Sequence, residues 1–268
     1  MLQLYHVAGS SNSQRVRIVL TEKEIPWESH QLTQSAELHT AEFRAISPSG
    51  TVPALVHDGR SLVDSVVINE YLEDVFPARP LRPADPYLAG RMRQWVKHAD
   101  DYWQRSIAVF THALTRREAV LAAYDGDLDA ALASITDPII LSWRRSVYRD
   151  GLASPHALEA MRLITASLAQ LDAALQGEEW LVNGRFTLAE AALLPAVFRL
   201  QCLAMDFLWI FCGATRHRSS RRCPPRTCAI SLARQRRSKR CKMTLHGPPE
   251  RKARRPCTRR RTYRIRSC

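Results

Sequence analysis

The sequence predicts an α/β domain with helices on a mixed sheet, followed by an all-helical domain and an irregular basic tail. Three observations lead to this order. Strand-like segments and one tight hairpin occur near the start of the chain, and apolar residues recur at helical spacing beyond a proline-rich segment. The charge then changes abruptly. Residues 1–209 hold 19 basic and 25 acidic side chains, whereas residues 210–268 hold 20 basic and one acidic side chain.

Composition excludes several classes of protein. The chain of 268 residues is 46% apolar, which is enough to bury the core of one large or two small domains. No segment approaches the ~20 unbroken apolar residues of a membrane-spanning helix, and residues 1–7 lack the pattern of a signal peptide. Within residues 1–209 the one cysteine is Cys202. We therefore expect a cytoplasmic protein without disulfides or membrane association.

Alternating strand formers and small polar residues define the first elements. Residues 2–7 are rich in strand formers and predict a strand. The polar loop Gly9–Ser13 follows, and its hydroxyl and amide side chains are suited to cap a helix that includes Val16. Residues 25–27 open a second extended segment, and residues 36–46 predict a short helix or helical turn.

The clearest local pattern is a hairpin. Residues 52–57 and 60–64 are separated by Asp58-Gly59, and this pair tolerates positive φ at both central positions of a tight turn. A helix then begins at Asp64-Ser65, with apolar residues spaced i, i+3, i+4 and i+7. These are Ile68, Tyr71, Leu72 and Val75. Together the elements predict a small α/β domain over residues 1–78.

A proline-rich run separates this domain from a helical one. Three prolines within residues 77–83 disfavour regular hydrogen bonding, so residues 79–84 are predicted to be a linker. Beyond the linker, apolar periodicity predicts helices. They are expected at residues 92–110, at residues 164–175 and from the capping box of Thr187 and Glu190. Residues 85–209 are therefore predicted to form an all-helical second domain.

These segments resemble a known family. SSNSQRVRIVL, SGTVPALVHDG and DSVVINEYLEDVFP resemble the thioredoxin-like domain of the soluble glutathione S-transferase superfamily, and RFTLAEAALLPAVFRL resembles the capped helix of its helical domain. The first segment is similar to the zeta and phi classes, which use a serine. LSWRR and residues 71–103 resemble bacterial glutathione-dependent β-aryl etherases. Over residues 1–209 the resemblance implies a thioredoxin-like fold and an enzyme with glutathione as co-substrate.

Glutathione is an extended tripeptide with two carboxylates, one ammonium and one thiol, and an extended peptide can pair with a strand edge. Val52 could offer its N–H and C=O to the cysteinyl residue, while Pro53 ends the pairing. The resemblance implies a cis bond between them. Because a helix N-terminus favours a carboxylate, Ser65 is expected to bind the γ-glutamyl carboxylate and Asp64 the γ-glutamyl ammonium, with ordinary helix capping as the alternative. By resemblance, His39 would meet the glycyl carboxylate.

The loop before the first helix supplies candidate catalytic groups. A free thiol has a pKa of ~8.5, and a hydroxyl donor at a helix N-terminus stabilises the thiolate. Ser10 matches the family's catalytic serine by its spacing to Val16. Asn12-Ser13 resembles the pair in the etherase-like loop, which makes Ser13 the rival donor, and Asn12 stands where zeta-like enzymes carry a cysteine. Ser11 is a further candidate, and helix capping is the alternative role for all these hydroxyls.

The acceptor substrate is expected between the two domains, along the first long helix. His98 and Tyr102 are candidate residues of the acceptor pocket, whereas Trp95, Trp103 and Trp143 are assigned to packing. Residues 1–209 contain no pattern of metal ligands, so no metal cofactor is expected.

Residues 210–268 follow none of these patterns. They are rich in Arg, Cys, Pro and Ser and lack apolar periodicity. A basic cluster of this kind is typical of nucleic-acid binding, but the abrupt change near residue 209, within an expected helix, favours an out-of-frame translation. The cysteine spacings do not match those of zinc ligands. On either interpretation we expect this tail to be disordered.

The sequence therefore predicts a glutathione transferase that acts on a hydrophobic electrophile, and the resemblance implies a homodimer. Cleavage of a β-aryl ether by the same thiolate is one alternative. A nucleic-acid-binding protein that uses its basic tail, and a non-catalytic scaffold with the same fold, are the alternatives from other classes.

Overall fold

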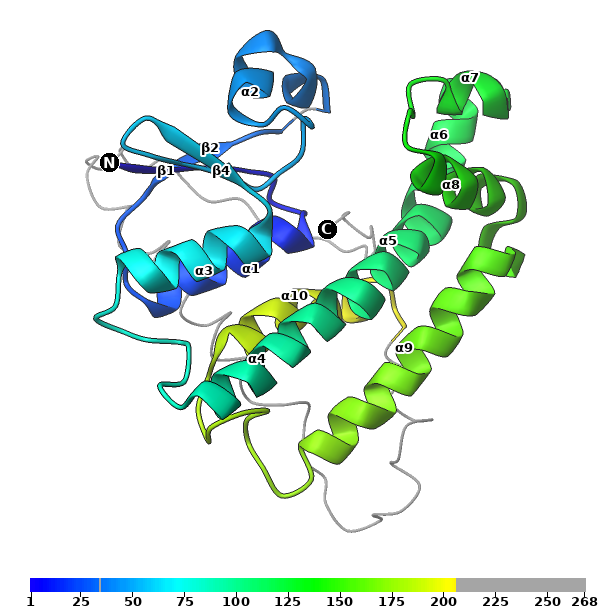
Figure 1. Cartoon of the computed structure of the whole chain (residues 1–268). Coiled ribbons are helices and arrows are strands. Elements are labelled where there is room, and N and C mark those ends of the chain that lie inside the picture. Colours follow the sequence, from blue (N-terminus) through cyan, green and yellow to red (C-terminus); the bar gives the residue numbers. More distant parts are fainter. Residues whose placement is uncertain (34, 206–268) are drawn as a thin grey trace, which may run out of the picture. The chain divides into compact units, whose positions relative to one another are not determined.

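The computed structural model describes residues 1–33 and 35–205, which form a sheet with helices followed by a helical domain (Figure 1). The predicted fold class is confirmed for this part of the chain. The interpretation of residues 210–268 as a basic tail lies outside the described residues. Within the described ranges, no helix is long and apolar enough to cross a membrane.

Four strands form a mixed sheet in the order β2-β1-β3-β4. They are β1 (Leu2–His6), β2 (Glu28–Gln31), β3 (Ala54–His57) and β4 (Arg60–Val63). β1 pairs in parallel with β2 and antiparallel with β3, which pairs antiparallel with β4. The predicted hairpin is confirmed, because Asp58 and Gly59 join β3 to β4 with φ angles of 47° and 79°.

Two helices of the first domain, α1 (Ser11–Glu22) and α3 (Ser65–Val75), contact each other and lie on the same face of the sheet (Figure 1). The helix predicted within residues 36–46 is divided into a 3-10 turn and α2 (Ala41–Ile46). The division occurs because the Thr40 side chain accepts a hydrogen bond from the N–H of Phe43 and so caps a new helix.

The second domain is helical, and its predicted capping box at Thr187 is present. The helices are α4 (Pro86–His98), α5 (Arg105–Thr111), α6 (Arg117–Ala123), α7 (Leu128–Leu132), α8 (Pro138–Asp150), α9 (Pro155–Ala174) and α10 (Leu188–Cys202). α10 packs against both α1 and α4, so the two domains share a contact surface.

The first long helix differs from the regular helix that the sequence predicts over residues 92–110. Two π-helical segments, η2 (Ala99–Gln104) and η3 (His112–Arg116), connect α4, α5 and α6. Apolar periodicity does not reveal a change of backbone hydrogen-bond register, so these segments have no simple sequence pattern. Trp103 in η2 is fully buried, as predicted, and Trp95 and Trp143 are partly buried against the same core.

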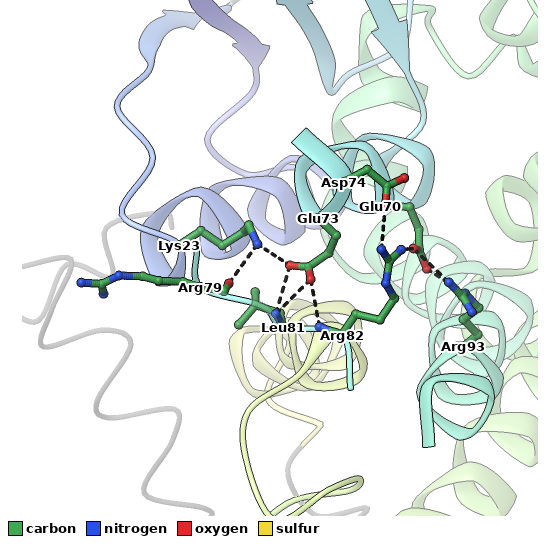
Figure 2. A network of polar contacts seen from close by, with 8 residues as sticks. All are labelled: Lys23, Glu70, Glu73, Asp74, Arg79, Leu81, Arg82 and Arg93. Atoms are coloured by element: carbon green, nitrogen blue, oxygen red, sulfur yellow. Dashed lines mark hydrogen bonds and ion pairs between the residues drawn. The ribbon is translucent and has the colours of Figure 1, made fainter. Parts of the chain in front are cut away.

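An interior ion pair fixes the linker between the domains (Figure 2). Lys23, which directly follows α1, places its Nζ 2.6 Å from Glu73 Oε1 of α3, and these side chains are 0% and 2% exposed. Glu73 also accepts hydrogen bonds from the N–H groups of Leu81, at 3.0 and 3.1 Å, and Arg82, at 3.0 Å. Lys23 donates to the carbonyl of Arg79 at 2.9 Å. The predicted linker is therefore anchored to α3 and to the C-terminal end of α1.

A second group of charges extends this network towards the surface. Glu70 of α3 accepts from Arg82 at 2.8 Å and from Arg93 of α4 at 3.1 Å, and Arg82 also binds Asp74 at 2.6 Å (Figure 2). These contacts connect α3, the linker and α4 in one polar cluster.

Candidate active site

The sheet brings the three predicted binding segments to one end of the first domain. Ala54, the first residue of β3, pairs with Tyr5 near the end of β1 and with Val63 at the end of β4. The segments that adjoin these strand ends therefore lie close together. They are the loop Gly9–Ser13, Val52–Pro53 and Asp64–Ser65. The N-termini of α1 and α3 lie at this same end of the sheet, and their partial positive charges favour binding of an anionic ligand.

Val52 and Pro53 lead into β3. Their peptide bond is cis, which confirms the expectation from the resemblance. Pro53 is buried and Val52 is half-buried. Within residues 1–33 and 35–205, neither the N–H nor the C=O of Val52 takes part in a backbone–backbone hydrogen bond. Both groups can therefore pair with an extended peptide.

Asp64 and Ser65 begin α3. Asp64 has a φ of 74°, and its Oδ1 accepts hydrogen bonds from the N–H groups of Val66 at 2.8 Å and Val67 at 3.1 Å. The carboxylate of Asp64 thus caps the helix while remaining exposed to solvent. Ser65 is 3% exposed at the first position of the helix. Asp64 can therefore cap α3 and bind a ligand ammonium at the same time.

The four loop candidates have different environments. Ser10 caps α1, because its Oγ accepts a hydrogen bond from the N–H of Ser13 at 3.2 Å. The Ser11 hydroxyl lies 2.8 Å from the side-chain amide of Gln104 in η2. Asn12 is half-buried, whereas Ser13 is fully buried, and its Oγ has no hydrogen-bond partner among the described residues. Ser10 and Ser11 are the two serines of the loop with exposed surface.

His39 lies at the end of the 3-10 turn and is exposed. Its Nδ1 is 3.2 Å from Arg44 Nη2 of α2, and Arg44 also donates to the carbonyl of Pro48 at 3.2 Å. Because a guanidinium can only donate, Nδ1 of His39 accepts in this contact. Arg44 is therefore a permanent cation beside His39, and sequence reasoning missed it because an Arg in a short helix is usually a surface residue.

His98 and Tyr102 form an aromatic group along α4 and η2. The ring of His98 lies 4.7 Å from that of Tyr102 and 5.5 Å from that of Trp95, measured between centroids. Burial lowers the pKa of His98, while Asp101 opposes the shift, and its buried Nε2 has no hydrogen-bond partner among the described residues. Tyr102 is 39% exposed.

A pocket of about 800 Å³ is lined by residues of η2, α5, α8 and α9 and the segment that leads into α8. His98 and Tyr102 do not contribute to its walls. Its lining is mostly apolar and includes Val109, Ile140, Trp143 and Leu163, with Gln104 at the side nearest the loop serines. Concave apolar surfaces of this size are typical of small-molecule sites. Among residues 1–33 and 35–205, no group of three or more His, Cys, Asp or Glu side chains is placed to hold a metal ion.

Two arginines hold the backbone that leads to Ser10. Arg17 donates to the carbonyls of Val7 at 3.3 Å and Ala8 at 3.0 Å, and Arg199 at the end of α10 donates to the carbonyl of Gly9. Arg17 also lies 2.9 Å from Nδ1 of His6. These contacts fix the course of the loop from two helices that are far apart in sequence.

His6 is expected to make stability depend on pH. Burial, together with the charges of Arg17 and His30, lowers the pKa of His6 to about 4, whereas an unfolded His has a pKa of ~6.5. Between these values the unfolded state binds more protons, so stability rises with pH. We expect the free energy of unfolding to decrease as the pH falls from about 6.5 towards 4.

Urea unfolding at a series of pH values measures this effect. His6→Gln should flatten the dependence, because glutamine keeps polar atoms but does not titrate. Ser61→Ala, at an exposed position of β4 without a titratable side chain, is the control and should leave the profile of the parent chain unchanged. An identical profile for the parent and His6→Gln would contradict the assignment.

Comparison with known proteins identifies the family. The family models for the N-terminal and C-terminal domains of glutathione S-transferases match residues 4–80 and 142–218. Protein LigF of Sphingobium sp. is 34% identical over 195 residues, which cover 70% of this chain and 75% of LigF. The chain belongs to the glutathione S-transferase family. Its relatives in this family include transferases, isomerases and etherases, so it is a glutathione-using enzyme.

Solved structures of glutathione S-transferases have the same fold. The crystal structure of the beta-etherase LigF from Sphingobium sp. strain SYK-6 has a TM-score of 0.68 and 27% identity, and the match covers 90% of this chain and 96% of LigF. A probable maleylacetoacetate isomerase of Drosophila melanogaster is 40% identical over 97 residues, which are 35% of this chain and 43% of that protein. The match to the etherase LigF therefore covers more of this glutathione S-transferase than the match to the isomerase does.

Several residues of this glutathione S-transferase site have no sequence pattern that would reveal them. Arg15, Asp100 and Gln104 meet across the two domains, and Arg199 contacts a loop 190 residues away in the sequence. Isolated charged and amide residues on helices usually face solvent. The one available signal is the position of Arg15, which lies between apolar residues on the buried face of α1.

Proposed function

We propose that this glutathione S-transferase holds glutathione at the end of its sheet and uses the thiolate to attack a carbon atom of a hydrophobic electrophile. The observation that carries this proposal is the convergence of three segments on one edge: the loop of Ser10, the strand entry at Val52 and the N-terminus of α3. Each offers a group that complements one part of an extended, doubly anionic thiol tripeptide.

Binding would use backbone and side-chain groups together. Val52 would pair with the cysteinyl residue, whereas Ser65 and Asp64 would bind the carboxylate and ammonium of the γ-glutamyl residue. His39 and Arg44 would meet the glycyl carboxylate. The guanidinium of Arg44 supports this assignment, because a charge-assisted hydrogen bond to a carboxylate is stronger than a neutral one.

Ser10 would stabilise the thiolate. Its Oγ accepts from the N–H of Ser13, so the hydroxyl hydrogen remains available for a second partner. The helix N-terminus adds a partial positive charge at the same place. Both effects favour the thiolate over the thiol and would lower the pKa of bound glutathione below its free value of ~8.5.

The pocket between α5, α8 and α9 would bind the hydrophobic electrophile. Its apolar lining and its volume of about 800 Å³ suit a molecule of one or two aromatic rings. Gln104 contributes to this pocket and also contacts Ser11, which connects the pocket to the helix start where the sulfur would lie. His98 and Tyr102 would then stand outside the pocket and support η2.

Cleavage of an aryl ether is the second candidate, and the similarity to the etherase LigF over most of both chains favours it. The chemistry differs from conjugation in the leaving group alone. The thiolate forms a carbon–sulfur bond as the carbon–oxygen bond breaks, and the electron pair leaves with the aryloxide, which then takes a proton from water.

We also propose that the enzyme is a cytoplasmic homodimer. The single cysteine within residues 1–209 suits a reducing compartment. Val67 of α3 and Tyr87 of α4 are 51% and 73% exposed, so apolar surface is available for a second copy. The molar mass in solution, measured by light scattering, tests the dimer.

Steady-state kinetics of the full chain test the function. With glutathione and a chloronitroaromatic or a β-aryl ether, Ser10→Ala is expected to lower kcat/KM roughly 10- to 100-fold, because one hydrogen bond to a charged group is lost. Ser61→Ala, an exposed serine of β4, is the control and should keep full activity. A parent enzyme that neither binds glutathione nor reacts with either substrate would refute the proposal, and the two products decide between conjugation and ether cleavage.

A further inference from the structure

A chain of polar contacts, centred on the buried Arg15, runs from α10 through α1 to η2. Arg15 of α1 is 1% exposed, pairs with Asp100 of η2 and donates from Nε to the carbonyl of Ala192 in α10 at 2.9 Å. Burial lowers the pKa of Arg15, while Asp100 and Asp64 oppose the shift. Arg15 of the first domain is therefore held by two elements of the helical domain.

The orientation of the Gln104 amide follows from its neighbours. With Oε1 facing Arg15, Gln104 accepts from Nε at 3.0 Å and from Nη2 at 3.1 Å, and Nε2 donates to Ser11 Oγ at 2.8 Å. The side-chain amide of Asn12 lies 3.2 Å from the same Oε1. With the amide reversed, its N–H groups would face a guanidinium that can only donate. This orientation gives Gln104 complementary partners in Arg15 and Ser11, and the Asn12 amide complements it when its own NH2 group faces Oε1.

This orientation determines the role of the Ser11 hydroxyl. Since Ser11 Oγ accepts from Gln104, its own hydrogen is free to donate to another group. The hydroxyl hydrogen of Ser10 is free to donate as well, because Ser10 Oγ accepts from the N–H of Ser13. Both serines have exposed surface at the N-terminus of α1, whereas Ser13 is fully buried. Two hydroxyl donors can therefore point towards one sulfur.

We propose that Gln104, itself oriented by Arg15, is a positioning residue that turns the Ser11 hydroxyl towards the glutathione sulfur, so that Ser11 and Ser10 both donate to the thiolate. This inference rests on the proposed function and extends it. Because the chain of polar contacts includes Gln104 of η2, the helical domain takes part in thiol activation and not just in binding the electrophile. The π-helical geometry of η2 agrees with this, since such segments often occur at functional sites.

The pKa of the bound glutathione thiol is the decisive measurement, obtained from the ultraviolet absorbance of the thiolate as a function of pH with the full chain. Loss of one hydrogen bond to the thiolate raises this pKa by about one unit. We expect such a shift in Ser11→Ala and in Gln104→Met. Because Gln104 acts through Ser11, the double variant should show no larger shift than Ser11→Ala alone.

Two further variants sharpen the test. Gln104→Glu keeps the length of the side chain and an oxygen for Arg15 but can only accept, so it would take the Ser11 hydrogen and raise the thiol pKa at least as much as Ser11→Ala. Gln94→Met, an exposed glutamine of α4, is the matched control and should produce no shift. If Gln104→Met does not fold, Gln104→Glu carries the test.

The outcomes separate this inference from the proposed function. The positioning role is overturned if Gln104→Met raises the pKa of the bound thiol equally in the parent chain and in the Ser11→Ala variant. It is also overturned if Gln104→Met does not raise this pKa in the parent chain. If the parent enzyme lowers the thiol pKa and Ser10→Ala restores it while Ser11 and Gln104 have no effect, the proposed function stands and this inference fails. A parent enzyme that binds glutathione without lowering the thiol pKa overturns both.

Discussion

Glu73→Gln is expected to lower the free energy of unfolding by about 3–5 kcal/mol, because it leaves the buried Lys23 ammonium without its counter-charge. Glutamine is nearly the same size, so the loss would not reflect a cavity. For a chain of this length the midpoint of thermal unfolding would fall by roughly 10 °C. Urea denaturation of the full chain measures the change directly.

Glu70→Gln is the matched control on the same helix. Glu70 accepts hydrogen bonds from the side chains of Arg82 and Arg93, but its own side chain is 27% exposed and that of Arg93 is 52% exposed. Solvent screens such pairs, and the expected loss is about 1 kcal/mol or less. Equal losses for the two variants would show that burial does not determine the contribution of Glu73.

The double variant Lys23→Met/Glu73→Met separates charge from anchoring. Replacement of a whole buried ion pair by apolar residues often costs little. Here, however, the N–H groups of Leu81 and Arg82 would lose their acceptor, and each unpaired buried donor costs about 1–3 kcal/mol. We therefore expect only partial recovery, and full recovery would mean that the linker can find other partners.

Trp103→Ala is expected to destabilise the protein by a similar amount, about 3–5 kcal/mol, because the side chain is fully buried in the core. Its Nε1 has no hydrogen-bond partner among the described residues, so the loss comes from packing alone. Trp103→Phe should therefore cost clearly less, since it keeps most of the volume and removes an unsatisfied donor.

Trp95→Ala is the control for Trp103→Ala. Trp95 is on the same long helix but is partly exposed, so its truncation should cost less than half as much. Urea unfolding of the three variants gives the comparison. A loss for Trp95→Ala as large as that for Trp103→Ala would place the centre of the helical core elsewhere.

Features that depend on neighbouring residues could be predicted from the sequence. The Asp58-Gly59 turn is one example, because positive φ at both positions is a local requirement. The capping box of Thr187 and Glu190 is another, since it is complete within four residues.

Features that depend on distant partners could not be predicted. Lys23 and Glu73 are 50 residues apart, and each alone resembles a solvent-exposed helix residue. The Ser11 hydroxyl contacts Gln104, which lies 93 residues further along the chain. The apolar pocket beside Gln104 opens between helices whose contacts with one another the sequence does not reveal.

The contact of Arg199 with the carbonyl of Gly9 has a consequence for protein engineering. The two family domains could be treated as separate modules, one of which is grafted onto a relative. Such a hybrid would separate Arg199 from Gly9 and Arg15 from Asp100, because each pair has one member in either half. A working chimera of this enzyme must therefore transfer both members of these pairs, even when the graft itself is confined to one module.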